Sequence, residues 1–408
     1  MVRRSRTPAQ PVLPLWEGQS KGSPASRARR SLRSVGLFSG VGGLELGLQK
    51  AGHETSLLCE IEPSARAVLA KRFPDVPVHD DVCTLKALPK GTDLLVGGFP
   101  CQDLSQAGQT RGIEGSRSGL VGEVFRLLRK QRVPWLVLEN VPFMLQLAGG
   151  EALEVIVAAL EELGYRWAYR VVDTRAFGLP QRRRRVLLVA SLEDDPRTVL
   201  FGQDAGEPED GPFAGRACGF YWTEGVRGLG WAIDAVPTLK GGSTVGVPSP
   251  PAIWMPDGRI VTPDLRDAER LQGFAAEWTK PAETVVRTSF RWKLVGNAVS
   301  VPVAKWLGES LAQPRAFSLA GVRELSHHKA WPTNAWNVGA GRFTADMSEF
   351  PVRLKRKSLE GFLREEPKLL SPKATAGFLA RMEKGNLRFP PGFMAALRAH
   401  LRVVAKAA

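Results

Sequence analysis

The chain has 408 residues and a net charge of +15, with 43% hydrophobic and 24% charged residues. This length predicts two or three domains, and the composition is typical of a globular protein with a sizeable core. No apolar run reaches the roughly 18 residues that a membrane helix needs, so no membrane association is expected. The N-terminus lacks the continuous apolar stretch of a secretory signal, and an organellar transit peptide is the alternative for this Arg-rich leader.

The positive charge lies at the two ends of the chain. Residues 1–35 hold eight Lys/Arg and one acidic residue, residues 313–408 hold seventeen and seven, and the middle is close to neutral. Basic extensions on a near-neutral body suit an enzyme that binds a polyanion such as nucleic acid, although solvated tails have the same composition. Residues 1–33, rich in Pro, Ser and Arg, are expected to form a disordered basic leader.

From Ser34 onwards, short apolar runs alternate with stretches that have helical periodicity. Strands are expected at 35–38, 55–59, 94–96, 136–138 and 186–190, and helices at 43–52, 63–73 and around 153–160. This alternation predicts a doubly wound α/β sheet, in which 94–96 and 136–138 are buried parallel strands. Residues 193–262 are rich in Gly and Pro and are expected to form a small loop-rich insert. Helices are expected again at 263–273, 301–311, 358–364 and 373–384.

A glycine-rich turn, Phe38–Gly43, follows the first predicted strand and opens the first predicted helix. Glycines allow a tight turn and a close approach to a ligand, and the helix N-terminus adds polarised N–H groups. Glu60 follows the second strand about 20 residues later, where nucleotide-binding sheets place a carboxylate for ribose hydroxyls. Asp81 lies at the same edge one strand further and is suited to an adenine amino group. These features predict a pocket for an adenosine-containing ligand, either S-adenosylmethionine or a nicotinamide dinucleotide.

The four cysteines show no CxxC spacing, so neither a metal site nor a disulfide framework is expected. Cys59, Cys83 and Cys218 are interpreted as small buried hydrophobic residues. Cys101 directly follows Pro100 in a glycine-rich loop after the fourth strand, at the sheet edge where such folds carry out chemistry.

Several blocks of the chain resemble the motifs of DNA (cytosine-5) methyltransferases. They occur in the order of the family, from about residue 34 to 311: GGFPCQDLSQAG (97–108), RGIEGSRSGL (111–120), WLVLENV (135–141), QRRRR (181–185), RLQGF (270–274) and LVGNAV (294–299). The resemblance implies a Rossmann-like catalytic domain at 34–192 that binds S-adenosyl-L-methionine. It also implies a target-recognition region at 193–262 and a return to the catalytic domain at 263–312. It leaves the leader and a basic C-terminal extension, 313–408, unexplained.

The resemblance also implies roles for individual polar residues of these blocks. Cys101 would attack C6 of a cytosine flipped out of the DNA duplex, which makes C5 nucleophilic. Glu139 would bind N3 and the exocyclic amine of that base. Arg183 and Arg185 alternate in a strand and would share one face, where they would hold the base carbonyl, the nucleophile loop or a phosphate. Their neighbours Arg182 and Arg184 would face solvent.

On the cofactor side, the resemblance implies contacts from nine residues, two of which, Val82 and Leu120, are equally suited to the core. The nine are Phe38, Val41, Glu60, Ile61, Asp81, Val82, Pro100, Leu120 and Asn297. A phenylalanine in the glycine turn offers a π-face to a sulfonium methyl donor.

Within the insert, Pro237-Thr238-Leu239 resembles a short element of family inserts, and Arg227, Lys240 and Arg259 are candidates for guanine contacts. Phosphate contact or solvation is the competing interpretation for each of these three, and the target sequence itself does not follow from the chain.

As partners, the resemblance implies double-stranded DNA and a possible restriction endonuclease acting on the same site. It also implies a monomer in the bacterial cytoplasm, associated with the nucleoid. Three other classes of protein share some of these features. A tRNA cytosine-5 methyltransferase has the same blocks, but the insert and the basic ends favour DNA. A catalytically silent DNA-binding relative would not need Cys101 and Glu139. A nicotinamide-dependent dehydrogenase would leave the Pro-Cys and Glu-Asn-Val blocks without a role.

Overall fold

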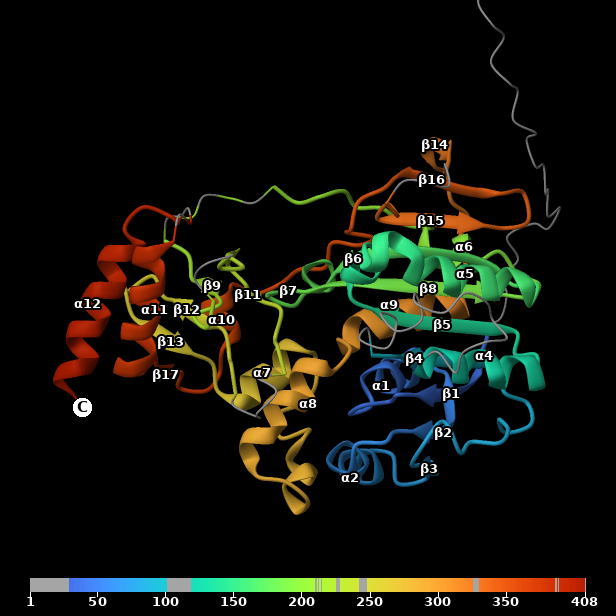
Figure 1. The fold of residues 1–408 in the computed structure, drawn as a ribbon, viewed down its shortest axis with the longest axis horizontal. Coiled ribbons are helices and arrows are strands. Elements are labelled where there is room, and N and C mark those ends of the chain that lie inside the picture. The colour runs from blue at the N-terminus through green and yellow to red at the C-terminus, as the bar shows by residue number, and fades with distance from the viewer. Residues whose placement is uncertain are drawn as a thin grey trace, which may run out of the picture.

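The computed structural model describes residues 29–407 except 101–118, 225–227, 242–247, 326–329 and the single positions 210, 212, 214, 386 and 388. These residues form two lobes (Figure 1), which we call the sheet lobe and the small lobe. The sheet lobe is built on a ten-stranded sheet of order β14-β16-β15-β6-β8-β5-β4-β1-β2-β3. The small lobe contains a five-stranded sheet of order β10-β9-β12-β13-β17.

The centre of the large sheet confirms the strands that the sequence predicts. Five strands run parallel: β1 (Arg33–Leu37), β2 (Glu54–Cys59), β3 (Val78–His79), β4 (Leu94–Gly98) and β5 (Trp135–Asn140). β8 (Arg184–Ser191) is antiparallel both to β5 and to β6 (Arg166–Asp173). The sequence pattern did not predict β6, whose charged and aromatic residues break up the apolar run.

Helices cover both faces of this sheet, which explains why its strands are apolar along their whole length. Leu136 and Leu138 of β5 pack in one core cluster with α4 (Leu120–Lys130) and α5 (Glu151–Glu162). Trp135 and Val137 pack in the other, with α1 (Gly43–Lys50), α6 (Arg197–Leu200) and α9 (Val301–Ala312). α1 and α9 approach closely because Gly47 has no side chain: a Cβ there would lie 2.3 Å from that of Ala304.

The first half of the C-terminal extension continues the large sheet beyond β6. Its strands are β14 (Ala320–Glu324), β15 (Asn334–Asn337) and β16 (Arg342–Asp346), and β15 pairs with β6 in antiparallel register. Arg342 also pairs with Glu154 and Glu161 of α5, at 2.7 and 2.9 Å. The described residues of the segment 313–346 therefore belong structurally to the sheet lobe.

The small lobe combines the insert with the second half of the extension. Its strands are β9 (Cys218–Phe220), β10 (Ala232–Ile233), β12 (Ala252–Trp254), β13 (Ile260–Thr262) and β17 (Lys368–Leu369). The helices α10 (Leu359–Phe362) and α11 (Pro372–Lys384) confirm two of the predicted helices, whereas α12 (Phe393–Lys406) was not predicted. Phe220 of β9 stacks on Phe378 of α11 at 5.4 Å and meets Phe393 of α12 at 5.1 Å. The insert is thus a short-stranded sheet that buries its aromatic face against the C-terminal helices.

Between the lobes lie α7 (Leu265–Leu271), α8 (Arg291–Asn297) and a short parallel pair, β7 (Gln181–Arg182) with β11 (Val236–Pro237) (Figure 1). The helix α2 (Pro63–Arg72) belongs to the sheet lobe, where its Leu69 packs with Leu58 of β2. The 3₁₀ turns in the described residues are η2 (Pro142–Leu145), η3 (Leu147–Gly150), η4 (Thr174–Phe177), η5 (Lys280–Thr284) and η6 (Thr288–Phe290). No helix in the described ranges is both long and apolar enough to cross a membrane.

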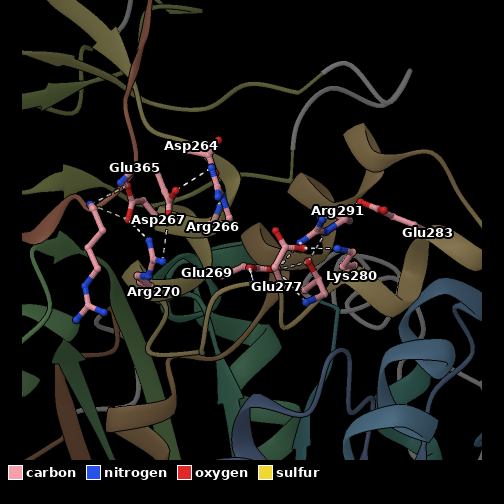
Figure 2. A network of polar contacts seen from close by, with 12 residues as sticks. Asp264, Arg266, Asp267, Glu269, Arg270, Glu277, Lys280, Glu283, Arg291 and Glu365 are labelled. Atoms are coloured by element: carbon pink, nitrogen blue, oxygen red, sulfur yellow. Dashed lines mark hydrogen bonds and ion pairs between the residues drawn. The ribbon is translucent and has the colours of Figure 1, made fainter.

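A network of charged residues holds the C-terminal extension to α7 and α7 to α8 (Figure 2). The fully buried Asp267 accepts the backbone amides of Arg364 and Glu365 at 3.0–3.1 Å and pairs with Arg270 at 2.6 Å. Two residues further along α7, the fully buried Glu269 pairs with Arg291 at 3.0 Å. α7 therefore connects the returning C-terminal segment to the helix that carries Asn297.

Candidate active site

All nine residues predicted to contact a cofactor line one cavity of about 330 Å³. It lies at the carboxyl ends of β1, β2 and β4, and its other lining residues include Gly40, Cys59, Glu62, Gly98 and Lys293. Ile61 is 65% exposed and lies at the surface of this cavity. The cavity is within the range of roughly 300–1,000 Å³ typical of small-molecule sites.

The glycine turn forms one wall of this cavity in a conformation that ordinary residues adopt rarely. Phe38, Gly40 and Gly42 have φ angles of 54°, 54° and 80°. At Gly42 a Cβ would lie 2.4 Å from the ring of Phe73, so only glycine fits there. A non-glycine residue at positive φ is strained, and such strain is concentrated at functional sites.

Glu60 fixes the glycine turn from the end of β2. Its Oε2 accepts the Gly40 N–H at 2.7 Å, and its Oε1 accepts the Glu62 N–H at 2.8 Å. Asp81 is held in a similar way, since its Oδ1 accepts the Cys83 N–H at 2.9 Å. A carboxylate oxygen has two lone pairs, so each of these oxygens can still accept a hydroxyl or an amine from a ligand.

Sequence reasoning missed two charged residues of the cavity. Lys293 of α8 and Glu62 form an ion pair at 3.5 Å, and the Lys293 ammonium also lies 4.8 Å from the centroid of the Phe290 ring. Lys293 is adjacent to the LVGNAV block and Glu62 is two residues after Glu60. Their closeness in sequence to recognised motifs was the signal that could have identified them as cavity residues.

Glu139 and Arg185 form a buried ion pair beside the cavity. The Arg185 Nε lies 2.8 Å from the Glu139 Oε1, and both side chains are about one-tenth exposed. By the geometric criteria for a hydrogen bond, this oxygen has no partner among the described residues, so the contact is an ion pair. Burial lowers the pKa of Arg185, and the Glu139 charge opposes that effect. Glu139 is the cross-strand partner of Gly98, which lines the cavity.

Arg183 is engaged with the backbone instead. Its guanidinium donates to the carbonyls of Leu239, Gly296 and Ala298 at 3.2, 3.1 and 2.7 Å. Burial lowers its pKa well below the usual value, and the nearby Arg185 adds to that effect. Arg183 lies between β7 and β8, so the expectation that it alternates with Arg185 within one strand was wrong. Its three bonds join this block to the insert and to the end of α8.

The remaining arginines of this block differ in exposure. The Arg184 side chain is 47% exposed and bonds to Glu349, with its Nε 2.6 Å from Oε2. Arg182 is half-buried. Gln181 is fully buried, donates to the Leu271 carbonyl at 2.8 Å and accepts the Leu239 N–H at 3.1 Å. Sequence reasoning gave Gln181 no role, although it stands inside a recognised block.

Cys101 itself lies outside the described residues, as do Arg227 and the residues of the family blocks between 101 and 118. The chain just before Cys101 is held by Asn140. The Asn140 side chain donates to the Phe99 carbonyl at 3.1 Å and accepts the Val141 N–H at 2.8 Å. Asn140 thus fixes the chain two residues before Cys101.

The other three cysteines are poor nucleophiles in this structure. Cys59 and Cys218 are buried, and burial raises the pKa of each to about 12. Cys83 is exposed, so its interpretation as a buried hydrophobic residue was wrong: it lies in the loop after Asp81 rather than in an element that packs. Its pKa is also raised, by desolvation and then by Asp81.

A buried carboxyl lies beneath the glycine turn. Glu45 of α1 is fully buried, and neither of its carboxyl oxygens has a partner in acceptable hydrogen-bond geometry, although the Ser39 hydroxyl is near. It occupies the space left by Gly36, where a Cβ would lie 2.0 Å from Oε1. Desolvation raises the pKa of Glu45 to about 7.

Two candidate contact residues of the insert lie in the described part. Lys240 pairs with Glu224, and its ammonium lies 3.7 Å from the centroid of the Tyr221 ring. Arg259 is 48% exposed and pairs with Asp257 at 2.6 Å.

Comparisons with known proteins assign the family. Residues 32–210 match the model of C-5 cytosine-specific DNA methylases. The chain is 48% identical over 380 residues to Type II methyltransferase M2.BsuMI of Bacillus subtilis, covering 90% of this chain and 97% of that protein. It is 31% identical to Type II methyltransferase M.BsuFI of the same species, covering 75% and 76%.

A crystal structure of the S. pombe Dnmt2 methyltransferase shares the fold, with a TM-score of 0.52, 18% identity and coverage of 69% of this chain and 98% of that one. The large mixed sheet with helices on both faces is accordingly the Rossmann-like α/β sheet of methyltransferases. The chain therefore belongs to the C-5 cytosine-specific DNA methylase family, and it is a DNA methyltransferase that acts on carbon 5 of cytosine.

Proposed function

We propose that methyl transfer takes place where the Glu139–Arg185 pair meets the end of β4, with Cys101 as the nucleophile. The observation that carries this proposal is that Gly98 and Pro100 line the cofactor cavity while Gly98 is also the cross-strand partner of Glu139. Cys101 is joined to Pro100 by one peptide bond, so their Cα atoms are about 3.8 Å apart. The nucleophile, the acid and the methyl donor would then share one small volume.

In the proposed reaction, the Cys101 thiolate forms a bond to C6 of an extruded cytosine. Glu139 gives a proton to N3 and accepts a hydrogen bond from the exocyclic amine, through the Oε1 that has no such partner in the described residues. The electron pair now at C5 takes the methyl group. A base, with water as the simplest candidate, removes the C5 proton. The thiolate then leaves as the C5–C6 double bond re-forms, and N3 returns its proton to Glu139. The raised pKa values of the other three cysteines support Cys101 in this role.

Arg185 and Arg183 would act differently. Arg185 keeps Glu139 in place and has donors left for the base carbonyl. Arg183 is a positioning residue, because its guanidinium donates to three backbone carbonyls and so holds the end of α8.

The cavity suits S-adenosyl-L-methionine as the cofactor. This cofactor supplies a methyl group on a sulfonium cation. The charged residues of the lining are Glu60, Glu62, Asp81 and Lys293, an excess of carboxylates that favours a cation and disfavours the pyrophosphate of a nicotinamide dinucleotide. Glu60 would bind the ribose hydroxyls, Asp81 the adenine amine, and Phe38 and Ile61 would contact the apolar parts. Asn297 would lie against the methionine end.

We further propose that the small lobe reads the DNA sequence, with Lys240 at its rim. Because the relatives are Type II methyltransferases, a cognate restriction endonuclease for the same site is expected. A monomer in the cytoplasm, associated with the nucleoid, is the simplest state for such an enzyme.

The nucleophile assignment is tested with DNA that contains 5-fluorocytosine. Fluorine at C5 cannot leave as a proton does, so the thiolate stays bonded and a denaturation-resistant complex accumulates. The wild type and the exposed-cysteine control Cys83→Ser are expected to form this complex, and Cys101→Ser is not. A trapped complex with Cys101→Ser would refute the assignment, as would its absence in the wild type under conditions where unmodified DNA is methylated.

A further inference from the structure

At the rim of the small lobe, two segments of the insert form one polar cluster beside α8, the helix whose Asn297 lines the cofactor cavity. We call this cluster the rim cluster; it comprises residues 221–224 and 238–241. The Tyr221 hydroxyl donates to the Thr238 carbonyl at 2.9 Å, and the Lys240 ammonium lies over the Tyr221 ring and pairs with Glu224. A Cβ at Gly241 would lie 3.1 Å from the Asn297 Oδ1, so the cluster directly adjoins the cofactor cavity.

The rim cluster is held from outside the insert by α11 of the C-terminal extension. Arg381 donates from Nη2 to the Trp222 carbonyl at 2.8 Å and from Nε to the Glu224 carbonyl at 3.0 Å. These bonds carry the guanidinium charge and are stronger than neutral ones. Because they end on backbone carbonyls, they constrain the path of the loop itself.

The helix that carries Arg381 is itself fixed. Phe378 and Met382, on the same helix, are 0% and 2% exposed and pack in the core of the small lobe with Phe220 and Phe393. Arg381 therefore projects from a rigid support, which is a requirement for placing a neighbouring loop accurately.

We propose that Arg381 is a specificity-determining positioning residue, which sets the path of residues 222–224 and, through Glu224, the location of the Lys240 ammonium against the DNA. This inference rests on the proposed role of the small lobe in reading DNA. Discrimination between bases depends on a few donors placed correctly at base edges, and a displaced donor binds correct and incorrect sites more equally. The C-terminal extension thus takes part in sequence recognition although it lies outside the insert.

The test compares the DNA sequence preference of the wild type with that of Arg381→Met. This variant keeps the aliphatic part of the side chain but loses its hydrogen-bond donors. Arg398→Met is the matched control, because within the described residues the exposed Arg398 of α12 has a single ion pair, with Glu383 of α11 at 3.0 Å. Each protein is produced in a methylation-deficient bacterial host, and genomic 5-methylcytosine is mapped by bisulfite sequencing. The preferred motif is then compared with its single-base variants in oligonucleotides by kcat/KM.

We expect Arg381→Met to lower the ratio of preferred to variant kcat/KM by about tenfold, the scale of one misplaced base contact. Affinity for S-adenosylmethionine should stay at the wild-type value, Arg381→Lys should recover part of the ratio, and Arg398→Met should leave it unchanged. An unchanged ratio in Arg381→Met, or an equal fall in Arg398→Met, would overturn the proposal.

Glu224→Gln provides a second test that does not depend on the folding of the arginine variant. It leaves the backbone acceptors of Arg381 intact but removes the ion pair with Lys240, so it should lower the same ratio. In the double variant with Arg381→Met, the loss should not exceed that of the larger single variant, because both changes act on one element. Additive losses, or a wild-type ratio in Glu224→Gln, would contradict the proposal. A wild type that methylates cytosine without any preference would instead refute the recognition role of the small lobe.

Discussion

Replacing Glu45 with glutamine should remove a pH-dependent loss of stability. The Glu45 carboxyl is fully buried without a well-formed hydrogen bond, and burial raises its pKa from 4.5 to about 7. The difference corresponds to about 3 kcal/mol, at roughly 1.4 kcal/mol per pKa unit. The folded state binds this proton more tightly than the unfolded state. Its contribution to stability is therefore fully present below about pH 4.5, declines as pH rises, and is lost above about pH 7.

The measurement is urea denaturation of the wild type and of Glu45→Gln at intervals from pH 5 to pH 8.5. Glutamine has nearly the same shape as glutamate but does not ionise, so its free energy of unfolding should lack this component. The informative quantity is the difference in the free energy of unfolding between the two proteins at each pH. In this difference the contributions of all other titrating groups cancel. That difference should move in favour of the variant by about 2–3 kcal/mol between pH 5 and pH 8.

A constant difference across this range would refute the reasoning. It would mean that the folded protein holds Glu45 in the same protonation state as the unfolded chain. Glu54→Gln, an exposed change on β2, serves as the control and should show no such trend.

Three further predictions concern the site and its support. Glu60→Gln should weaken binding of S-adenosylmethionine about ten- to hundredfold in calorimetric titration, because the charge-assisted bonds to the Gly40 and Glu62 amides become neutral. An unchanged affinity would contradict the role of Glu60 in the cofactor site. Asn140→Ala should lower kcat about tenfold or more while leaving cofactor affinity nearly intact, since it frees the Phe99 carbonyl two residues before Cys101; an unaltered kcat would remove this positioning role. Asp267→Asn should lower the free energy of unfolding by about 3–5 kcal/mol in urea denaturation, because it disrupts a buried acceptor for two amides and a guanidinium. A loss below about 1 kcal/mol would contradict the argument from burial.

Much of the central sheet was predictable because its strands are buried on both faces. Apolar runs such as Leu136–Leu138 can be recognised in the sequence as buried strands. The polar residue that follows each of these runs is then expected at the shared carboxyl edge of the sheet. This is why Glu60, Asp81 and Glu139 could be grouped before any contact was known.

The outer parts were not predictable, because their stability comes from pairing partners far away in the chain. All five residues of β14 are exposed, so no apolar pattern marks this strand. β17 pairs with β13 across more than 100 residues, and its own two residues carry no indication of it. The same holds for Arg184, whose partner Glu349 comes from the C-terminal extension.

With the proposed recognition role, the assembly of the small lobe determines how target specificity could be exchanged between enzymes of this kind. Its aromatic core is assembled from described residues of two stretches of chain, around 217–262 and 359–407. In the sequence these stretches are separated by β14–β16, which belong to the sheet lobe (Figure 1). A chimaera that receives only the insert of a relative would place foreign residues against the resident Phe378 and Phe393. Both stretches would have to be transplanted together, so the proposed recognition lobe would be exchanged as a discontinuous module.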